Sequence, residues 1–138
     1  MIRVFCNRRG SGKTKKLIEL ANSYVDKAKG DSVYIDKKNK NRIQLNNKIR
    51  FVATEEFKIT DCSSFYGAIC GIISGNFDIE NIYIDDFLSI VACDINDTYH
   101  LFNKLRSLTK EYNINLFINI DSEKGIPNFI KEYLFDAA

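Results

Sequence analysis

The amino-acid sequence predicts an α/β fold, a three-layer sandwich with a mainly parallel sheet of about five strands. Short segments that are apolar on both faces, such as 32–35 and 81–84, alternate with segments whose apolar residues recur at helical spacing. Strands with two apolar faces are typical of a parallel sheet that helices cover on each side. With 138 residues, 45% of them hydrophobic, residues 1–138 are expected to form a single domain.

Strand signals come from short apolar runs bounded by polar or turn-forming residues. They predict strands over 2–6, over 32–35 (ending at Asp36), over 49–53, over 81–84 (stopped by two aspartates) and over 114–118. The segment 41–48 is ambiguous. The very polar segment 36–42 is either a loop or the solvated start of a helix.

Helix signals come from apolar residues three and four positions apart. They predict a helix over 13–28, which Gly30 is expected to stop. Helix-start residues at 61–64 precede a mostly buried helix over 65–73. A short terminal helix is expected over 127–134. An amphipathic helix over 97–112 has one apolar face, formed by Leu101, Phe102, Leu105 and Leu108.

Charge and composition narrow the class of protein. The 20 basic and 18 acidic side chains give a net charge of +2, which indicates neither nucleic acid nor a membrane surface as a partner. No segment has the roughly eighteen consecutive apolar residues of a membrane helix, and a signal-peptide pattern is lacking, so we expect a cytoplasmic protein. The four cysteines form no Cys-x-x-Cys pair and the single His100 has no partner at metal spacing, so we expect reduced thiols and no zinc site.

The segment 7–14, Asn-Arg-Arg-Gly-Ser-Gly-Lys-Thr, predicts a phosphate-binding loop between the first strand and the first helix. Successive backbone N–H groups of such a loop bind an anion, and the following helix adds the positive end of its dipole. We expect Lys13 to reach the β- and γ-phosphates and the Thr14 hydroxyl to bind Mg²⁺. The other residues assigned to the nucleotide are Asn7, Arg8, Arg9, Gly10, Ser11 and Gly12.

The loop departs from the pattern G-x-x-x-x-G-K-[ST] at one position, where Asn7 replaces a glycine. Asparagine tolerates left-handed backbone angles better than most residues, so the loop remains feasible. The plainer alternative is a strand-to-helix turn that Gly10 and Gly12 shape, with Lys13 as a solvated charge.

Two aspartates follow the predicted strand 81–84, at the sheet edge where parallel α/β folds bind ligands. Asp85 is expected to orient Mg²⁺, and Asp86 to act as general base on a water or a substrate hydroxyl. Neighbouring residues of an extended strand point to opposite sides, so the two cannot share one role. Asn119, after the last strand, could sense the γ-phosphate or hold the water. The alternative for all three residues is a turn-forming role.

With these motifs the chain resembles a P-loop NTPase, with 7–14 as Walker A and 82–86 as Walker B. Two regions supply strands between these motifs, around 33–35 and 50–53. They suggest the RecA-like division, in which an extra strand separates the P-loop strand from the Walker B strand. In that division a glutamate usually follows the Walker B aspartate, whereas this chain has Asp86.

The order of 11–17, 84–87, 120–121 and 127–129 also resembles the core of type II thymidine kinases. The chain lacks the glutamate and glutamine that this family carries around the acidic motif. It also lacks the cysteine-bound zinc and the length for the family's nucleoside-binding lasso.

The resemblance implies three functions. The first is Mg²⁺-dependent hydrolysis of ATP or another nucleoside triphosphate, with Lys13 and Asp86 as catalytic residues. The second is a kinase for a nucleoside or similar hydroxyl compound. The third is a regulatory or assembly module that binds a nucleotide without turnover, which Asn7 and Asp86 favour. A homo-oligomer or a protein partner is compatible with each function, and nothing selects an arginine finger among Arg42, Arg50 and Arg106.

A kinase would need an acceptor pocket of its own. Four aromatic residues could line it, although core packing explains them more simply: Tyr66, Phe87, Tyr99 and Phe102.

Overall fold

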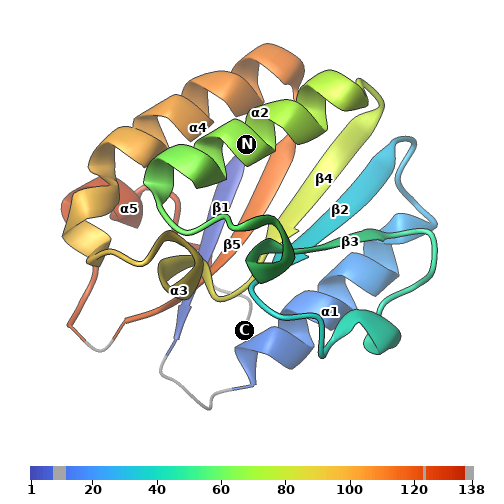
Figure 1. Cartoon of the computed structure of the whole chain (residues 1–138), viewed down its shortest axis with the longest axis horizontal. Helices are drawn as coiled ribbons and strands as arrows, with labels where there is room; N and C mark the ends of the chain where they lie inside the picture. The colour runs from blue at the N-terminus through green and yellow to red at the C-terminus, as the bar shows by residue number, and fades with distance from the viewer. Residues whose placement is uncertain (8–11, 123, 136–138) are drawn as a thin grey trace.

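The computed structural model describes residues 1–7, 12–122 and 124–135. Its five strands form one sheet in which every pair is parallel, in the order β1-β5-β4-β2-β3 (Figure 1). The predicted α/β fold with a parallel sheet of five strands is therefore confirmed. The strands are β1 (Ile2–Asn7), β2 (Asp31–Asp36), β3 (Arg50–Ala53), β4 (Ile79–Ile84) and β5 (Asn115–Asp121).

Helices cover both faces of the sheet, an arrangement compatible with a three-layer sandwich. One face is covered by α1 (Lys13–Val25), and the other by α2 (Cys62–Gly75) and α4 (Tyr99–Tyr112) (Figure 1). Among the described residues, no helix is both long enough and apolar enough to cross a membrane. The short elements are α3 (Phe87–Val91), α5 (Asn128–Lys131) and the 3₁₀ helices Arg42–Gln44, Thr54–Phe57 and Ile95–Thr98.

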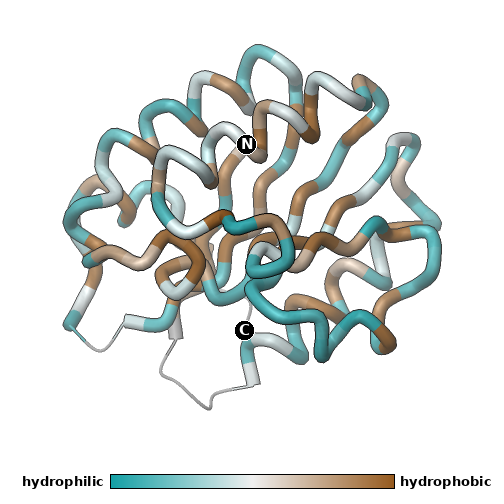
Figure 2. Tube along the Cα trace, viewed as in Figure 1, coloured by the Kyte–Doolittle hydropathy of each residue, from teal (hydrophilic) through white to brown (hydrophobic). Residues whose placement is uncertain are grey.

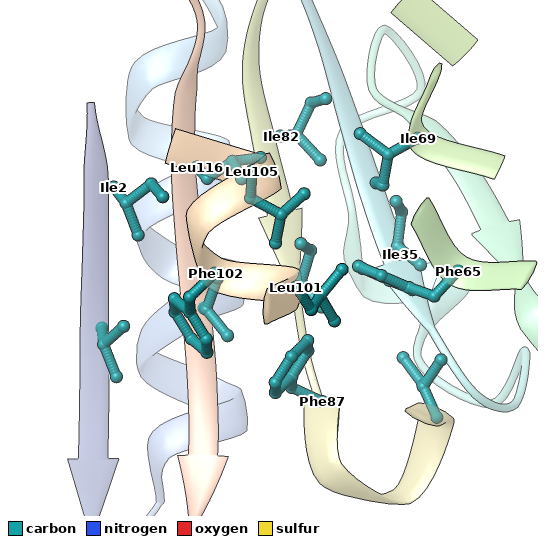
Figure 3. Packing of buried hydrophobic residues seen from close by; sticks show 14 of the residues in the cluster. Ile2, Ile35, Phe65, Ile69, Ile82, Phe87, Leu101, Phe102, Leu105 and Leu116 are labelled. Atoms are coloured by element: carbon teal, nitrogen blue, oxygen red, sulfur yellow. The ribbon is translucent and has the colours of Figure 1, made fainter. Parts of the chain in front are cut away.

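Two hydrophobic cores form because side chains alternate between the two faces of each strand. The larger core is aliphatic on its sheet side, with Phe65 and Ile69 of α2 packed above it (Figure 3). The smaller core, beneath α1, is aromatic on its sheet side and contains Tyr34, Tyr83 and Phe117. Figure 2 shows the central strands as mostly hydrophobic and the segment that follows β2 as hydrophilic.

The start of α2 agrees with the sequence prediction. The Asp61 carboxylate accepts a hydrogen bond from the Ser64 backbone N–H (2.7 Å), and the Ser64 hydroxyl accepts one from the Asp61 N–H (3.1 Å). Such a reciprocal pair satisfies N–H groups that a helix start leaves without partners.

Several element boundaries differ from the predictions. The last strand continues to Asp121 instead of ending at 118, and the helix predicted over 97–112 begins as a 3₁₀ turn before α4. The terminal helix covers only Asn128–Lys131, because the segment after it hydrogen-bonds to β1. The Val4 N–H donates to the Tyr133 carbonyl (2.8 Å), and the Phe135 N–H donates to the Val4 carbonyl (2.9 Å).

The helix α3 was not predicted. Its five residues are too few for a helical period to stand out, and three of them are buried: Phe87, Ile90 and Val91.

Candidate functional site at the carboxyl ends of the strands

Polar residues of neighbouring strands lie side by side on the face that α1 covers. In the register of the sheet, Tyr34 is opposite Tyr83, and Tyr83 is opposite Phe117. These rings pack beneath α1, and Asp36 of β2 and Asn119 of β5, two positions further along their strands, share that face, while Asp85 directly follows β4 between them. The resulting row consists of Asp36, Asp85 and Asn119, all of them buried.

Stacked aromatic rings form the floor under this polar row. The ring centroids of Tyr83 and Phe117 are 4.9 Å apart, those of Tyr34 and Tyr83 6.3 Å, and those of Tyr34 and Phe51 5.9 Å. The three pairs are close to parallel, with interplanar angles of 12°, 21° and 14°. Because the floor is apolar, charges directly above it interact more strongly than charges in water.

Asp85 is the central residue of the row, and only 3% of its surface is exposed. Its Oδ1 atom accepts hydrogen bonds from the Asp86 backbone N–H (2.9 Å) and from Asn119 Nδ2 (3.2 Å). Its Oδ2 atom accepts one from the Tyr34 hydroxyl (3.2 Å). Three donors therefore compensate the free-energy cost of burying this carboxylate. Without such partners the burial of a charge is strongly unfavourable.

Asn119 connects Asp85 to the beginning of α1. The same Nδ2 atom that donates to Asp85 also donates to the Lys13 carbonyl, at 3.1 Å. The residue lies inside β5 with only 1% of its surface exposed, so the alternative that it forms a turn is wrong. Its amide fixes the first turn of α1 beside the carboxylate that follows β4.

Lys13 is the first residue of α1, and its side chain is buried. Its ammonium group forms an ion pair with the carboxylate of Asp121, the last residue of β5. A positive charge is unfavourable at a helix N-terminus because the helix dipole is positive there. The residue that caps this end is Gly12, whose φ of 79° is a left-handed angle that glycine adopts without strain.

The surroundings of Asp36 shift the pKa of its carboxyl. Burial, followed by the neighbouring Asp85 carboxylate, raises its pKa to about 6. Hydrogen bonds from the Lys37 N–H to Oδ1 (2.7 Å) and from Asn41 Nδ2 to Oδ2 (3.4 Å) offset part of this rise. Burial and the like charge of Asp85 therefore leave this carboxyl about half protonated near pH 6.

Asp86 lies outside β4, which ends at Ile84, so the argument from strand alternation does not apply to it. It has a left-handed backbone (φ 56°, ψ 40°), and its carbonyl accepts the first hydrogen bonds of α3. It is half-buried, whereas Asp85 is buried. The surroundings of the two carboxylates thus differ, although the role predicted for Asp86 remains a prediction.

The remaining predicted site residues are placed only in part. Asn7 ends β1 in register with Asp121, and Thr14 is the half-buried second residue of α1. Residues 8–11, which include Arg8, Arg9, Gly10 and Ser11, lie outside the described residues. Of the predicted acceptor-pocket aromatics, Phe87 and Phe102 are core residues with ring centroids 5.7 Å apart, so core packing is confirmed for these two.

Besides Asp36, two residues of the site have no role predicted from the sequence. Asp121 comes two positions after Asn119, so strand alternation would have placed it on the same face had the strand been extended that far. In the sequence Tyr34 is one of the apolar residues of a predicted strand, and its hydroxyl acquires a partner only through the pairing of β2 with β4.

The residues predicted to hold Mg²⁺ carry the kind of ligand atom that a hard cation prefers. The Thr14 hydroxyl and the Asp85 carboxylate are oxygen donors, and Mg²⁺ in proteins typically binds one or two such groups together with phosphate oxygens and waters. Among the described residues no three His, Cys, Asp or Glu side chains cluster as a metal site, which such a binding mode does not require. No protein-family model matches the chain, and no curated protein matches it.

Proposed function

We propose that the chain is a P-loop NTPase that binds ATP, or another nucleoside triphosphate, together with Mg²⁺ and hydrolyses it. The observation that carries the proposal is the Asn119 amide, which hydrogen-bonds both the Lys13 carbonyl (3.1 Å) and Asp85 Oδ1 (3.2 Å). It supports the proposal because Lys13 and Asp85, which lie 72 positions apart in the sequence, are connected through one side chain. A phosphate-binding loop and an acidic residue for the metal must meet in space for this chemistry.

The charge distribution of α1 supports an anion as the ligand. The first turn contains no acidic residue, while Lys13, Lys15 and Lys16 are all basic. Cations at this end oppose the helix dipole and weaken an isolated helix. The same arrangement stabilises a bound phosphate, which satisfies the first N–H groups of the helix as well as the lysine charge.

The strand order supports the RecA-like resemblance. β5 lies between β1 and β4, so a strand separates the predicted P-loop strand from the predicted Walker B strand. The strands at 31–36 and 50–53 lie beyond β4, on its other side. On this basis Thr14 and Asp85 would hold Mg²⁺, which when bound neutralises charge on the β- and γ-phosphates.

A nucleotide-dependent module without turnover is the second candidate, and the ion pair between Lys13 and Asp121 favours it. The nucleotide must compete with Asp121 for the ammonium group of Lys13. This competition lowers the affinity for the nucleotide and makes its binding sensitive to solution conditions. The kinase alternative is weaker, because Phe87 and Phe102 belong to the hydrophobic core.

Nucleotide titration, followed by calorimetry with and without Mg²⁺, tests the proposal. Lys13→Ala should weaken ATP binding by roughly 10- to 100-fold, because a hydrogen bond to a charged group contributes about 1.5–3 kcal/mol. Lys27→Ala is the matched control: it removes the same charge from an exposed position past the far end of α1, a helix ~20 Å long. Asp121→Asn should tighten binding several-fold, since it removes the competing carboxylate.

If Lys13→Ala bound ATP as tightly as Lys27→Ala, the phosphate site would lie elsewhere and the proposal would be wrong. Phosphate release then separates the candidate functions. Release from ATP and Mg²⁺ alone indicates hydrolysis, and transfer that requires an added nucleoside indicates a kinase. Tight binding with neither indicates the module without turnover.

A further inference from the structure

Tyr34 contacts the carboxylate of Asp85, the residue proposed to orient the metal, from the aromatic floor under the polar row. It lies in the middle of β2, none of its surface is exposed, and its hydroxyl donates a hydrogen bond to Asp85 Oδ2 at 3.2 Å. Tyr34 belongs to the aromatic floor, while Asp85 belongs to the polar row above it. It is thus the one member of the floor whose polar atom reaches that row among the described residues.

The two oxygens of Asp85 are used differently. Oδ1 accepts two hydrogen bonds, one from the Asp86 N–H and one from Asn119. Among the described residues, Oδ2 accepts only the one from Tyr34. A carboxylate oxygen has about two lone-pair positions, so Oδ2 keeps one position for a cation or for a water bound to it.

The position of the Tyr34 hydroxyl is set by the sheet. The ring stacks between those of Phe51 (5.9 Å) and Tyr83 (6.3 Å), each on a neighbouring strand. A ring held on both faces cannot swing away from the carboxylate without disturbing the whole stack. The hydroxyl is therefore a fixed donor.

We propose that Tyr34 is a positioning residue, which holds the Asp85 carboxylate so that the open lone pair of Oδ2 faces the metal of a bound Mg²⁺–nucleotide. This inference deepens the proposed function and rests on it. The groups that orient a metal ligand typically contribute 10- to 100-fold to metal affinity. The role therefore predicts an effect on Mg²⁺ that is separate from any effect on the nucleotide.

Tyr83 provides a matched control for a substitution at Tyr34. It is also fully buried and stacked in the same floor, and its hydroxyl has no hydrogen-bond partner among the described residues. Tyr34→Phe and Tyr83→Phe thus remove the same atom from adjacent rings. Only the first removes a contact with Asp85.

The experiment measures ATP affinity by calorimetry over a series of Mg²⁺ concentrations, and again in EDTA, for the wild type and both variants. For Tyr34→Phe, the Mg²⁺ concentration that gives half of the maximal change in ATP affinity should be roughly tenfold higher than for the wild type. Tyr83→Phe should match the wild type, and all three proteins should bind ATP equally in EDTA. Thermal unfolding without ligand checks that both variants fold.

Each outcome is decisive. A shift in the Mg²⁺ requirement confined to Tyr34→Phe supports the inference. If both variants behaved alike, or if Tyr34→Phe needed less Mg²⁺, the inference would be overturned while the proposed function stood. If Mg²⁺ had no effect on nucleotide binding by the wild type, the proposed function and the inference would both fail.

Discussion

Replacing Asp36 with asparagine should stabilise the folded protein at neutral and alkaline pH. Burial and the carboxylate of Asp85 raise the pKa of Asp36 from 3.8 to about 6, and Asp86 adds to this rise. Asparagine has nearly the same shape and keeps an oxygen that accepts the hydrogen bond from the Lys37 N–H (2.7 Å). It carries no charge, so the repulsion and the burial of charge are both removed.

The magnitude follows from the linkage between proton binding and folding. Because the pKa is higher in the folded than in the unfolded state, the folded state binds more protons between about pH 4 and pH 6. The free energy of unfolding therefore falls as pH rises through this range and levels off above it. A pKa that is about two units higher in the folded state destabilises the fold by about 3 kcal/mol at pH 8 and by about 1 kcal/mol at pH 4.5.

Urea denaturation at the two pH values measures this difference. Asp36→Asn should exceed the wild type in free energy of unfolding by up to about 3 kcal/mol at pH 8 and by roughly 2 kcal/mol less at pH 4.5. Asp97→Asn, at an exposed position, is the control for removing one negative charge. A gain that did not change with pH, or a loss of stability at pH 8, would refute the argument from like charges in the row.

Three further predictions concern parts of the chain away from the row. Gly30→Ala should destabilise the fold by about 1–3 kcal/mol, because a Cβ at Gly30 would overlap the backbone carbonyl oxygen of Asp78 and lie 2.9 Å from the Glu80 Cβ. Gly67→Ala, in α2 with open space around it, should instead stabilise by roughly 0.5–1 kcal/mol, and thermal unfolding of the two variants checks the difference in sign. The Sγ atoms of Cys62 and Cys93 are 3.5 Å apart, so diamide should oxidise the pair to a disulfide worth roughly 3–4 kcal/mol, seen as faster migration on non-reducing gels. Migration that persisted in Cys62→Ser would exclude this pairing.

The sequence predicted the strands well because each is a short, mostly apolar run, and a run that is apolar on both faces has few alternatives. It also predicted that polar residues would gather at the carboxyl ends. It could not predict that Asp36 and Asp85 are neighbours, because that depends on β2 pairing with β4. No local pattern in the chain determines the order of parallel strands, since each connection passes through a helix or a long loop.

The residues that sequence reasoning missed share one cause. Tyr34 is an apolar strand residue by its sequence pattern, and only the fold shows that its hydroxyl lies 3.2 Å from Asp85 Oδ2. Asp121 follows the apolar run at 114–118 by three positions, so the strand signal ends before it. In both cases the meaning of a side chain depends on a partner from another strand. Local propensity carries no information about such partners.

The proposed site is internally paired before any ligand binds. Lys13 is paired with Asp121, and Asp85 is hydrogen-bonded by Tyr34, Asn119 and the Asp86 N–H. A phosphate that approached Lys13 would therefore exchange one anionic partner for another, whereas a cation that approached Asp85 Oδ2 would use a position the described residues leave open. Exchange contributes less free energy than the filling of an open position, because an existing interaction is lost. We therefore expect Mg²⁺ to contribute a larger share of the free energy of nucleotide binding than the charge of Lys13 does.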